Sequence, residues 1–281
     1  MGFVINNNLA ANNSYRNLNA TQNDLSKSLE KLSTGLRINR AGDDAAGLSI
    51  SEGLKAQVTG SAQAARNAQD GISVIQTTEG ALTEVHSILQ RMRDLAVQGA
   101  NDTNNADARK AIKAEGDSLG QELDRLTKAT NFNGIDLLKG GSLNIQVGTG
   151  GTAGTDSISV KLGDVATATG GLSDAAGTGA ADFVVDTSAN AQGSIVKIDA
   201  AIAAVSKSRA DLGASQNRLE HTVKSLNVAG ENLQAAQSRI ADVDMASEMV
   251  KFTKANILSQ AGTAMLAQAN QSSQGVLSLL R

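Results

Sequence analysis

The chain has 281 residues, in which 25 Lys and Arg stand against 28 Asp and Glu, and it contains no proline, cysteine or tryptophan. This near balance of charge argues against nucleic acid as a main partner, because phosphate binding needs an excess of basic side chains. The lack of cysteine excludes disulfides and thiolate sites. Only 2% of the residues are aromatic, so a core would have to be aliphatic, which favours closely packed helices.

The N-terminal segment has the spacing of a coiled-coil helix. One leucine stripe follows a 7-4-3-4 rhythm through Leu18, Leu25, Leu29, Leu32 and Leu36. Such a rhythm places the five side chains along one seam of a helix that packs against another helix.

Both ends of the chain, 4–25 and 256–280, combine apolar positions with many Asn and Gln and few charges. A helix of this composition cannot bury its apolar face alone and is marginal in water. We interpret the ends as helices that pack against other copies of the chain, and we expect them to be disordered in the monomer. The alternative is a disordered tail at each end.

Two further helices are predicted before residue 130. Asp43 and Asp44, in the motif GDDAAG, are N-cap candidates, and apolar residues at 3/4 spacing extend a helix from about 45 to 100. A turn cluster ends that helix. Residues 106–129 show the same spacing and predict a third helix, which NFNG at 131–134 terminates.

The middle zone, 141–193, is rich in Gly, Ser, Thr and Ala. Alternating segments at 143–147 and 157–162 predict a β-hairpin, and FVV at 183–185 is a candidate for another strand. GTGGTA at 148–153 matches a dinucleotide-binding fingerprint, but a strand pattern follows where that site needs a helix, so we favour a hairpin turn. The excess of Asp over Lys predicts a solvated, exposed zone.

Residues 194–281 return to helical spacing. Two rows of apolar residues recur every seven positions: Leu212, Leu219, Leu226, Leu233 and Ile240 in one, and Ala229, Ala236, Val243, Val250 and Ile257 in the other. A heptad pattern sustained this long favours a long coiled-coil helix over a helix of an ordinary bundle. We expect the two terminal zones to pair in antiparallel fashion around the middle zone.

No motif supports catalysis or metal binding. His86 and His221 lie on helical stretches, and the chain has neither a His-Glu-x-x-His pair nor a G-x-S-x-G elbow. Asp242 and Asp244 are interpreted as a helix cap or salt-bridge partners. We therefore expect no enzyme activity, no cofactor and no metal site.

Long strings in both halves of the chain resemble bacterial flagellin, the subunit of the flagellar filament. The strings are LEKLSTGLRINRAGDDAAGLSISEGLKAQ (29–57), QDGISVIQTTEGALTEVHSILQRMRDLAVQ (69–98), ATNFNGIDLL (129–138), LGASQNRLEHTVKSLNVAGENLQAAQSRIADVDMASEMVKFTKANILSQAGTAMLAQANQ (212–271) and the terminal VLSLLR. They cover about two-thirds of the chain. Because only 141–193 separates the two arms, the chain resembles a minimal flagellin that lacks large outer domains.

The resemblance implies a mainly α fold of long antiparallel coiled-coil helices with a small β-hairpin region. Residues 1–43 and 240–281 would form a terminal coiled coil that lines the filament interior. Residues 44–239 would form a rod-like outer core domain. The expected elements of that domain are helices at about 45–100, 106–129 and 194–239 and a β-hairpin or variable segment at about 131–193.

The implied function is that of a structural subunit that self-assembles into the flagellar filament for swimming motility. A hook–filament junction protein, or an enzyme on a flagellin scaffold, is the alternative. The implied partners are other copies of the chain, the cap and junction proteins of the flagellum, a cytoplasmic export chaperone and the flagellar type III export apparatus, with no membrane insertion. The expected location is extracellular, and the N-terminus lacks the pattern of a cleavable signal.

Two groups of residues are expected to carry this function. The apolar stripes of the two ends predict a polymer interface at Leu18, Leu25, Leu29, Leu32, Leu36, Ile257, Leu266, Val276, Leu277, Leu279 and Leu280. By resemblance, Arg91, Leu95 and Glu115 match positions that a vertebrate Toll-like receptor recognises, with Leu95 as an apolar anchor. Met92 and Ala96 are expected to face the chain's own core, and an ordinary amphipathic helix face is the alternative.

Overall fold

A computed structural model describes the chain except for residues 1–7, 153, 170–171, 173–182 and 280–281. Its fold is mainly α-helical, as the sequence predicts, and the described residues also form two small antiparallel sheets, of which the sequence predicts the second. The chain divides into two compact units. The terminal unit comprises residues 1–58 and 231–281, and the central unit comprises residues 59–230.

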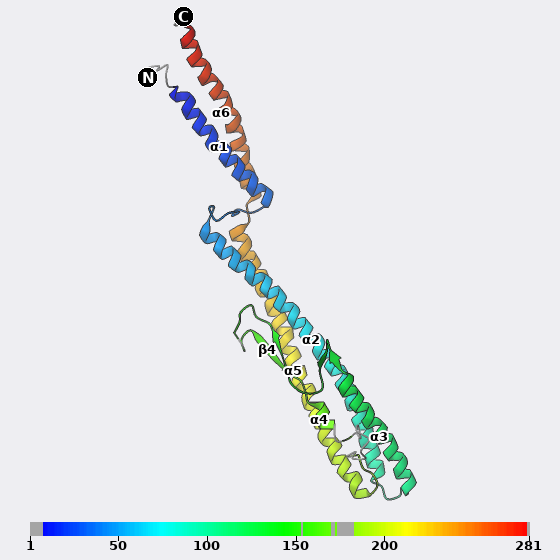
Figure 1. Cartoon of the computed structure of the whole chain (residues 1–281). Coiled ribbons are helices and arrows are strands. Elements are labelled where there is room, and N and C mark those ends of the chain that lie inside the picture. Colours follow the sequence, from blue (N-terminus) through cyan, green and yellow to red (C-terminus); the bar gives the residue numbers. More distant parts are fainter. Residues whose placement is uncertain (1–7, 153, 170–171, 173–182, 280–281) are drawn as a thin grey trace. The chain divides into compact units, whose positions relative to one another are not determined.

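Helices α1 (Leu9–Thr34) and α6 (Met245–Leu279) pack against each other in the terminal unit (Figure 1). The side chain of Asn8 caps the start of α1, and its amide also donates to the carbonyl of Ala269 on α6 at 2.9 Å. α1 ends at Gly35, whose φ of +74° is a left-handed conformation that favours glycine. The predicted pairing of the two ends of the chain is therefore present within a single copy.

Helices α2 (Ala45–Gly99) and α5 (Ser188–Ala241) each contribute residues to both units. Asp44 precedes α2 and caps its start, since its carboxylate accepts the N–H of Gly47 at 2.8 Å, as its place in the sequence predicts. α5 begins at Ser188, earlier than the predicted residue 194. The absence of proline allows both helices to continue for more than fifty residues, 55 in α2 and 54 in α5.

The helix breaks of the terminal unit pair with each other. The N–H of Arg37 donates to the carbonyl of Ala241 at 2.7 Å, and the N–H of Val243 donates to the carbonyl of Gly35 at 3.0 Å. The heptad row from Ala229 to Ile257 is therefore not continuous in one helix, because Val243 lies in the connector between α5 and α6.

The apolar core of the central unit lies between α2, α3 (Ala106–Ala129), α5 and the sheet formed by β3 (Ser142–Gln146) and β4 (Ser157–Lys161). α3 has the bounds that the spacing predicts. Fully buried side chains come from all of these elements and from the segment before α5: Leu82, Leu89, Met92, Leu123, Val160, Phe183, Ile198 and Leu212. This unit thus has an aliphatic core of its own.

Two hairpins follow α3. Strands β1 (Asn131–Phe132) and β2 (Ile135–Asp136) join through Asn133 and Gly134, whose φ values of 50° and 80° are those that a tight hairpin turn demands. In the second hairpin, Ser142 of β3 lies opposite Lys161 of β4.

The GTGGTA motif lies between β3 and β4, and the strand that follows it confirms the hairpin interpretation over nucleotide binding. A short helix, α4 (Val165–Thr169), follows β4.

The middle zone differs from the sequence prediction in two ways. Many of its described residues are exposed, as predicted, but its scattered apolar residues are buried: Val147, Ile158, Val160, Leu162, Val165 and Leu172. FVV at 183–185 forms no strand. Phe183 and Val185 are instead fully buried and anchor this segment to the core by their side chains. Phe183 lies so close to Gly116 of α3 that a Cβ there would come within 2.0 Å of the ring. The average composition of the zone hides these few anchoring residues.

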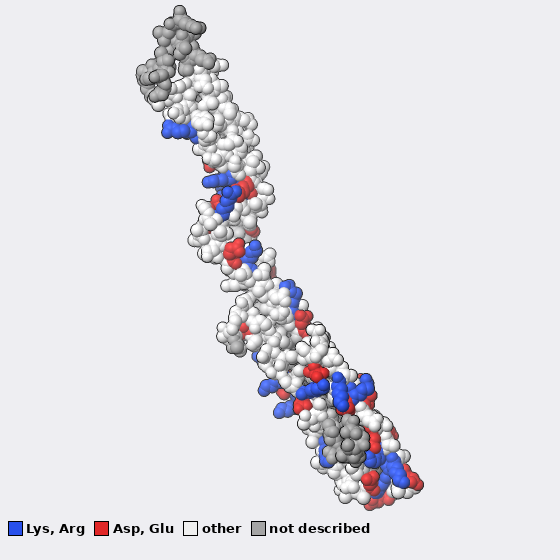
Figure 2. Space-filling view, in the orientation of Figure 1, with Lys and Arg blue, Asp and Glu red and all other residues white. Residues whose placement is uncertain are grey.

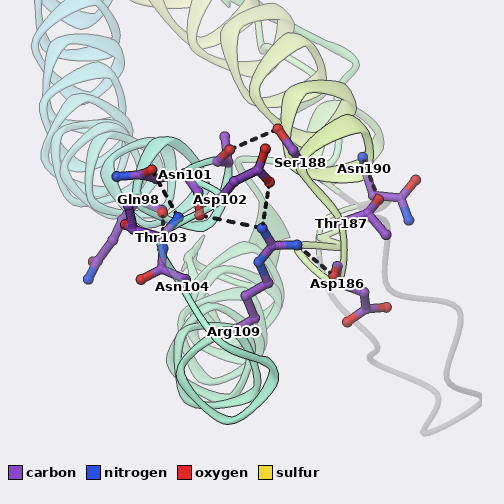
Figure 3. Close-up of polar contacts among 11 residues, drawn as sticks. Gln98, Asn101, Asp102, Thr103, Asn104, Arg109, Asp186, Thr187, Ser188 and Asn190 are labelled. Carbon is purple, nitrogen blue, oxygen red and sulfur yellow. Dashed lines mark hydrogen bonds and ion pairs between the residues drawn. The ribbon is translucent and has the colours of Figure 1, made fainter.

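A polar cluster around Arg109 ties the loop after α2 to the start of α5 (Figure 3). The guanidinium of Arg109 donates to the carbonyl of Asp186 at 3.0 Å and to the carboxylate of Asp102 at 3.0 Å. The hydroxyl of Ser188 donates to the carbonyl of Ala100 at 2.8 Å. Arg109 is mostly buried, so these bonds connect three segments of the central unit. The sequence analysis did not single out this cluster.

Candidate assembly surface

Unlike the central unit, the terminal unit buries almost no apolar side chains. Among its described residues, the buried ones are mainly small or polar: Ser28, Ile38, Gly47, Ser51, Ala241, Glu248 and Ala255. Apart from Ile38, its described large apolar side chains are half-buried or exposed instead. We define the assembly surface as Leu9, Tyr15 and Leu29 of α1 together with Met249, Val250, Ile257, Leu258 and Met265 of α6.

Part of the assembly surface is hollowed. A shallow groove of about 490 Å³ is lined by Met249, Val250, Thr253, Lys254, Ile257 and Leu258 of α6. A smaller groove of about 230 Å³ lies between α1 and α6, beside Leu18 and Met265. Few charged side chains lie over the stretches of these two helices that are nearest the chain termini (Figure 2). A hollowed, mainly apolar surface is suited to a protein partner.

The predicted polymer-interface residues fall into three groups. Leu29, Leu36 and Ile257 are exposed, at 51%, 37% and 61%. Half-buried positions are Leu18, Leu25, Leu32 and Leu266. The side chains of Val276, Leu277 and Leu279 and the whole of Leu280 lie outside the described residues.

The packing of α1 on α6 corrects one expectation. The terminal stripes were expected to be buried only between neighbouring copies, yet Leu18 lies against Gly262, where a Cβ would be 3.2 Å from Leu18 Cδ1. A glycine at this position lets the two helices approach closely within one chain. Each stripe is therefore divided between contacts inside the copy and exposed surface.

A buried carboxylate lies between α1 and α6. Glu248 is only 4% exposed, and its Oε1 accepts the hydroxyl of Ser28 at 2.7 Å. Lys251 donates to Oε2 at 3.0 Å. The hydrogen bond from Ser28 lowers the pKa of Glu248, and the charges of Lys251 and Lys31 lower it further. The sequence analysis missed this group, since nothing in its spacing distinguishes it from a solvated glutamate.

The receptor-matched residues lie on α2 and α3 of the central unit. Arg91 and Glu115 are exposed and form an ion pair, with Nε and Nη2 at 3.0 and 2.6 Å from Oε1. Leu95 is only 2% exposed, so the expectation of an exposed apolar anchor there is wrong. Met92 and Ala96 face the core, as predicted. Leu95 shares that face because it lies three residues from Met92 on the same helix.

The residues tested for chemistry have structural contacts. Asp244 caps α6, since its carboxylate accepts the N–H of Ala246 at 3.0 Å, and Asp242 accepts the hydroxyl of Ser238 at 2.6 Å. His86 lies 3.0 Å from the side-chain amide of Gln90. Within the described part of the chain, no three His, Cys, Asp or Glu side chains gather as metal ligands would, and no helix is long and apolar enough to cross a membrane.

Comparisons with known proteins agree with the helical fold and with the flagellin resemblance of the sequence. A model of the bacterial flagellin N-terminal helical region matches residues 5–142, and one of the C-terminal helical region matches residues 195–280. Flagellin from Halalkalibacterium halodurans is 52% identical over 99% of this chain and 100% of its own length. Flagellin from Bacillus subtilis is 47% identical over 99% of both chains.

One solved structure supports the fold alone. A flagellar hook-associated protein from Vibrio parahaemolyticus has a TM-score of 0.55 and 16% identity, covering 71% of this chain and all of its own. This chain and that protein thus share a fold, but the high sequence identity lies with the flagellins, and nothing favours the junction-protein alternative. The chain therefore belongs to the bacterial flagellin family and is a structural subunit of the flagellar filament.

Proposed function

We propose that this flagellin polymerises by burying the assembly surface between neighbouring copies. The observation that carries the proposal is the exposure of large apolar side chains in a unit that lacks an apolar core. Complete burial of a side chain such as Ile257 or Met265 contributes roughly 1.5–3 kcal/mol. Because every copy repeats the same contacts, this contribution recurs along the whole filament.

We also propose that the terminal helices, 1–43 and 240–281, line the interior of the filament and that 44–239 forms its outer rod. The charge pattern supports this arrangement. The part of α6 from Ala255 to Leu279 carries no charged residue, whereas α3 carries several ion pairs, among them Lys113–Asp117 and Lys128–Asp124. Uncharged surface is suited to burial and paired charge to solvent.

The route to the filament is part of the same proposal. The chain would leave the cell through the flagellar type III export apparatus, become extracellular and assemble beside the cap and junction proteins. A cytoplasmic chaperone would cover the groove on α6 that contains Met249 and Ile257, which prevents premature assembly. The subunit would have no catalytic role.

Host-receptor recognition is proposed at the ion pair of Arg91 and Glu115, which is exposed across α2 and α3. Leu95 would support the position of this pair from the core side and would not contact the receptor. In a receptor-reporter assay, monomeric Arg91→Ala should signal less than the wild type. Equal signalling from both folded proteins would contradict recognition at this pair.

The assembly proposal is tested with a double variant, Ile257→Ser with Met265→Ser. Both side chains are exposed, at 61% and 66%, so the monomer should remain folded while filaments fail to form. The matched control is Val196→Ser, which changes an apolar side chain of the central unit that is 69% exposed. Electron microscopy and sedimentation measure the polymer. Normal filament yield from the double variant would refute the proposed interface.

A further inference from the structure

A groove between α1 and α6 is lined by lysines. It has a volume of about 400 Å³, and its basic side chains are Lys27 and Lys31 from α1 and Lys251 and Lys254 from α6. Lys251 forms an ion pair with the buried Glu248 at 3.0 Å. The other three lysines have no carboxylate within ion-pair distance among the described residues. We call this surface the lysine groove.

The remaining lining residues leave the lysine groove with a positive balance. Asp24 and Glu248 are its acidic members, against the four lysines. Glu248 is 4% exposed and already accepts bonds from Ser28 and Lys251, so it offers no free carboxylate to the groove. An incoming group of opposite charge would therefore meet Lys27, Lys31 and Lys254.

The connectors of the same unit hold four carboxylates. Asp43 and Asp44 lie between α1 and α2, and Asp242 and Asp244 lie between α5 and α6. Their carboxylates accept hydrogen bonds from backbone N–H groups or from Ser238. None of the four forms an ion pair with any described residue. We call these four residues the acidic connectors.

The basic side chains beside the acidic connectors already have partners. Arg37 Nη2 donates to the carbonyl of Ile240 at 2.6 Å, and Arg40 pairs with Glu30 at 3.0 Å. Among the described residues, no lysine of the groove forms an ion pair with a connector carboxylate, although the charges of Lys31 and Lys27 add to the lowering of the pKa of Asp43 by its hydrogen bonds to the backbone. Within one copy, the lysine groove and the acidic connectors therefore do not bind each other.

We propose that the lysine groove of one copy binds the acidic connectors of a neighbouring copy. This inference rests on the proposed polymerisation and adds to it a polar contact that fixes how far one copy is displaced along the next. In a polymer built from head-to-tail contacts, two different patches on each copy can meet once per subunit. Complementary charge sets register and partner choice, which apolar stripes alone define poorly.

This contact needs only a small displacement of one copy along its neighbour. Lys27 lies seven residues before the end of α1 at Thr34, which is roughly 10 Å at the rise of an α-helix. A neighbour shifted by a little more than this distance along the helix pair brings its connectors beside the groove. The same shift leaves the apolar faces of α1 and α6 in contact along most of their length.

Charge reversal tests the contact. Lys27→Glu with Lys254→Glu should raise the critical concentration for polymerisation at least about tenfold, since like charges would then face each other. The matched control, Lys207→Glu with Lys224→Glu, changes the net charge of the chain equally at two exposed lysines of the central unit. It should polymerise like the wild type. Circular dichroism checks that each monomer is folded.

A mixing experiment decides the outcome. Asp242→Lys reverses one acidic connector and should also polymerise poorly by itself, whereas an equal mixture with the groove-reversed variant should recover long filaments. If the groove-reversed variant polymerises like the control, or if the mixture is no better than its parts, the lysine-groove contact is refuted. Failure of the wild type to polymerise would instead refute the proposed assembly function.

Discussion

Both units are built mainly from long helices, and they differ in what those helices bury. The central unit encloses a continuous aliphatic core that includes Leu82, Leu89 and Leu212. The terminal unit has a buried Ser28–Glu248 pair at the α1–α6 contact, and most of its described large apolar residues are half-buried or exposed. Helical periodicity thus indicates which side chains share a face. It does not indicate whether that face is covered within one copy or between copies.

The difference between the units follows from the number of helices that meet. In the central unit, α3 and the β3–β4 sheet add further packing partners to α2 and α5. In the terminal unit, α1 packs on α6, and two paired helices can cover only one stripe of each other. Under the proposed assembly, the remaining stripes pack against further copies of the chain.

The largest contrast between the units should appear when a large aliphatic side chain is truncated. Leu89 is fully buried in the central unit, so Leu89→Ala should lower the free energy of unfolding by about 2–5 kcal/mol. Ile257→Ala, at an exposed position of the terminal unit, should leave that free energy nearly unchanged and should weaken polymerisation. Urea unfolding followed by circular dichroism measures the first effect. Similar losses of monomer stability in both variants would contradict the comparison.

Close packing in the central unit is tested at a glycine. A Cβ on Gly116 would lie 2.0 Å from the ring of Phe183, so Gly116→Ala should cost about 1–3 kcal/mol of stability through overpacking. The control is Gly80→Ala on α2, where nothing lies within 4 Å of the added carbon. That change should stabilise the helix by up to about 1 kcal/mol. Thermal unfolding compares the two, and equal melting temperatures would remove the assigned role of Phe183 as an anchor.

The sequence predicted much of this architecture for an identifiable physical reason. Helix starts such as Asp44 and the bounds of α3 depend on local capping and spacing, which a single sequence displays. The burial of Phe183 and Leu95 depends on which face another segment covers, which local spacing does not specify. The Glu248–Ser28 pair joins residues 220 positions apart, so neither residue alone reveals it.

The buried carboxylate of the terminal unit predicts an effect of pH. The folded-state pKa of Glu248 is lowered, so its contribution to α1–α6 pairing is complete above the ordinary value of about 4.5 and is lost as pH falls through the folded-state pKa. Because the chain has no cysteine, spin labels at Gln22→Cys and Ser259→Cys would report the separation of the helices.

Between pH 6 and pH 3, the labelled wild type should show a growing separation between α1 and α6. Glu248→Gln should be less sensitive over the same range, because a glutamine has no proton to gain. Glu231→Gln, which removes an exposed carboxylate of the same unit, serves as the control and should behave like the wild type. An unchanged pH response in Glu248→Gln would show that other carboxylates control the pairing.

The smallest effect is expected at the exposed ion pair between α2 and α3. The side chains of Arg91 and Glu115 are 56% and 46% exposed, so water and salt screen the ion pair. Arg91→Ala should therefore lower the free energy of unfolding by at most about 1 kcal/mol. Arg109 is 14% exposed and donates to Asp102 and Asp186, and its replacement by alanine should cost more than that of Arg91. Unfolding of the two variants in low and high salt distinguishes the two contacts, because only the small loss of stability in Arg91→Ala should disappear in high salt. A larger loss at Arg91 than at Arg109 would mean that the surface pair, and not the mostly buried cluster, holds α3 in place.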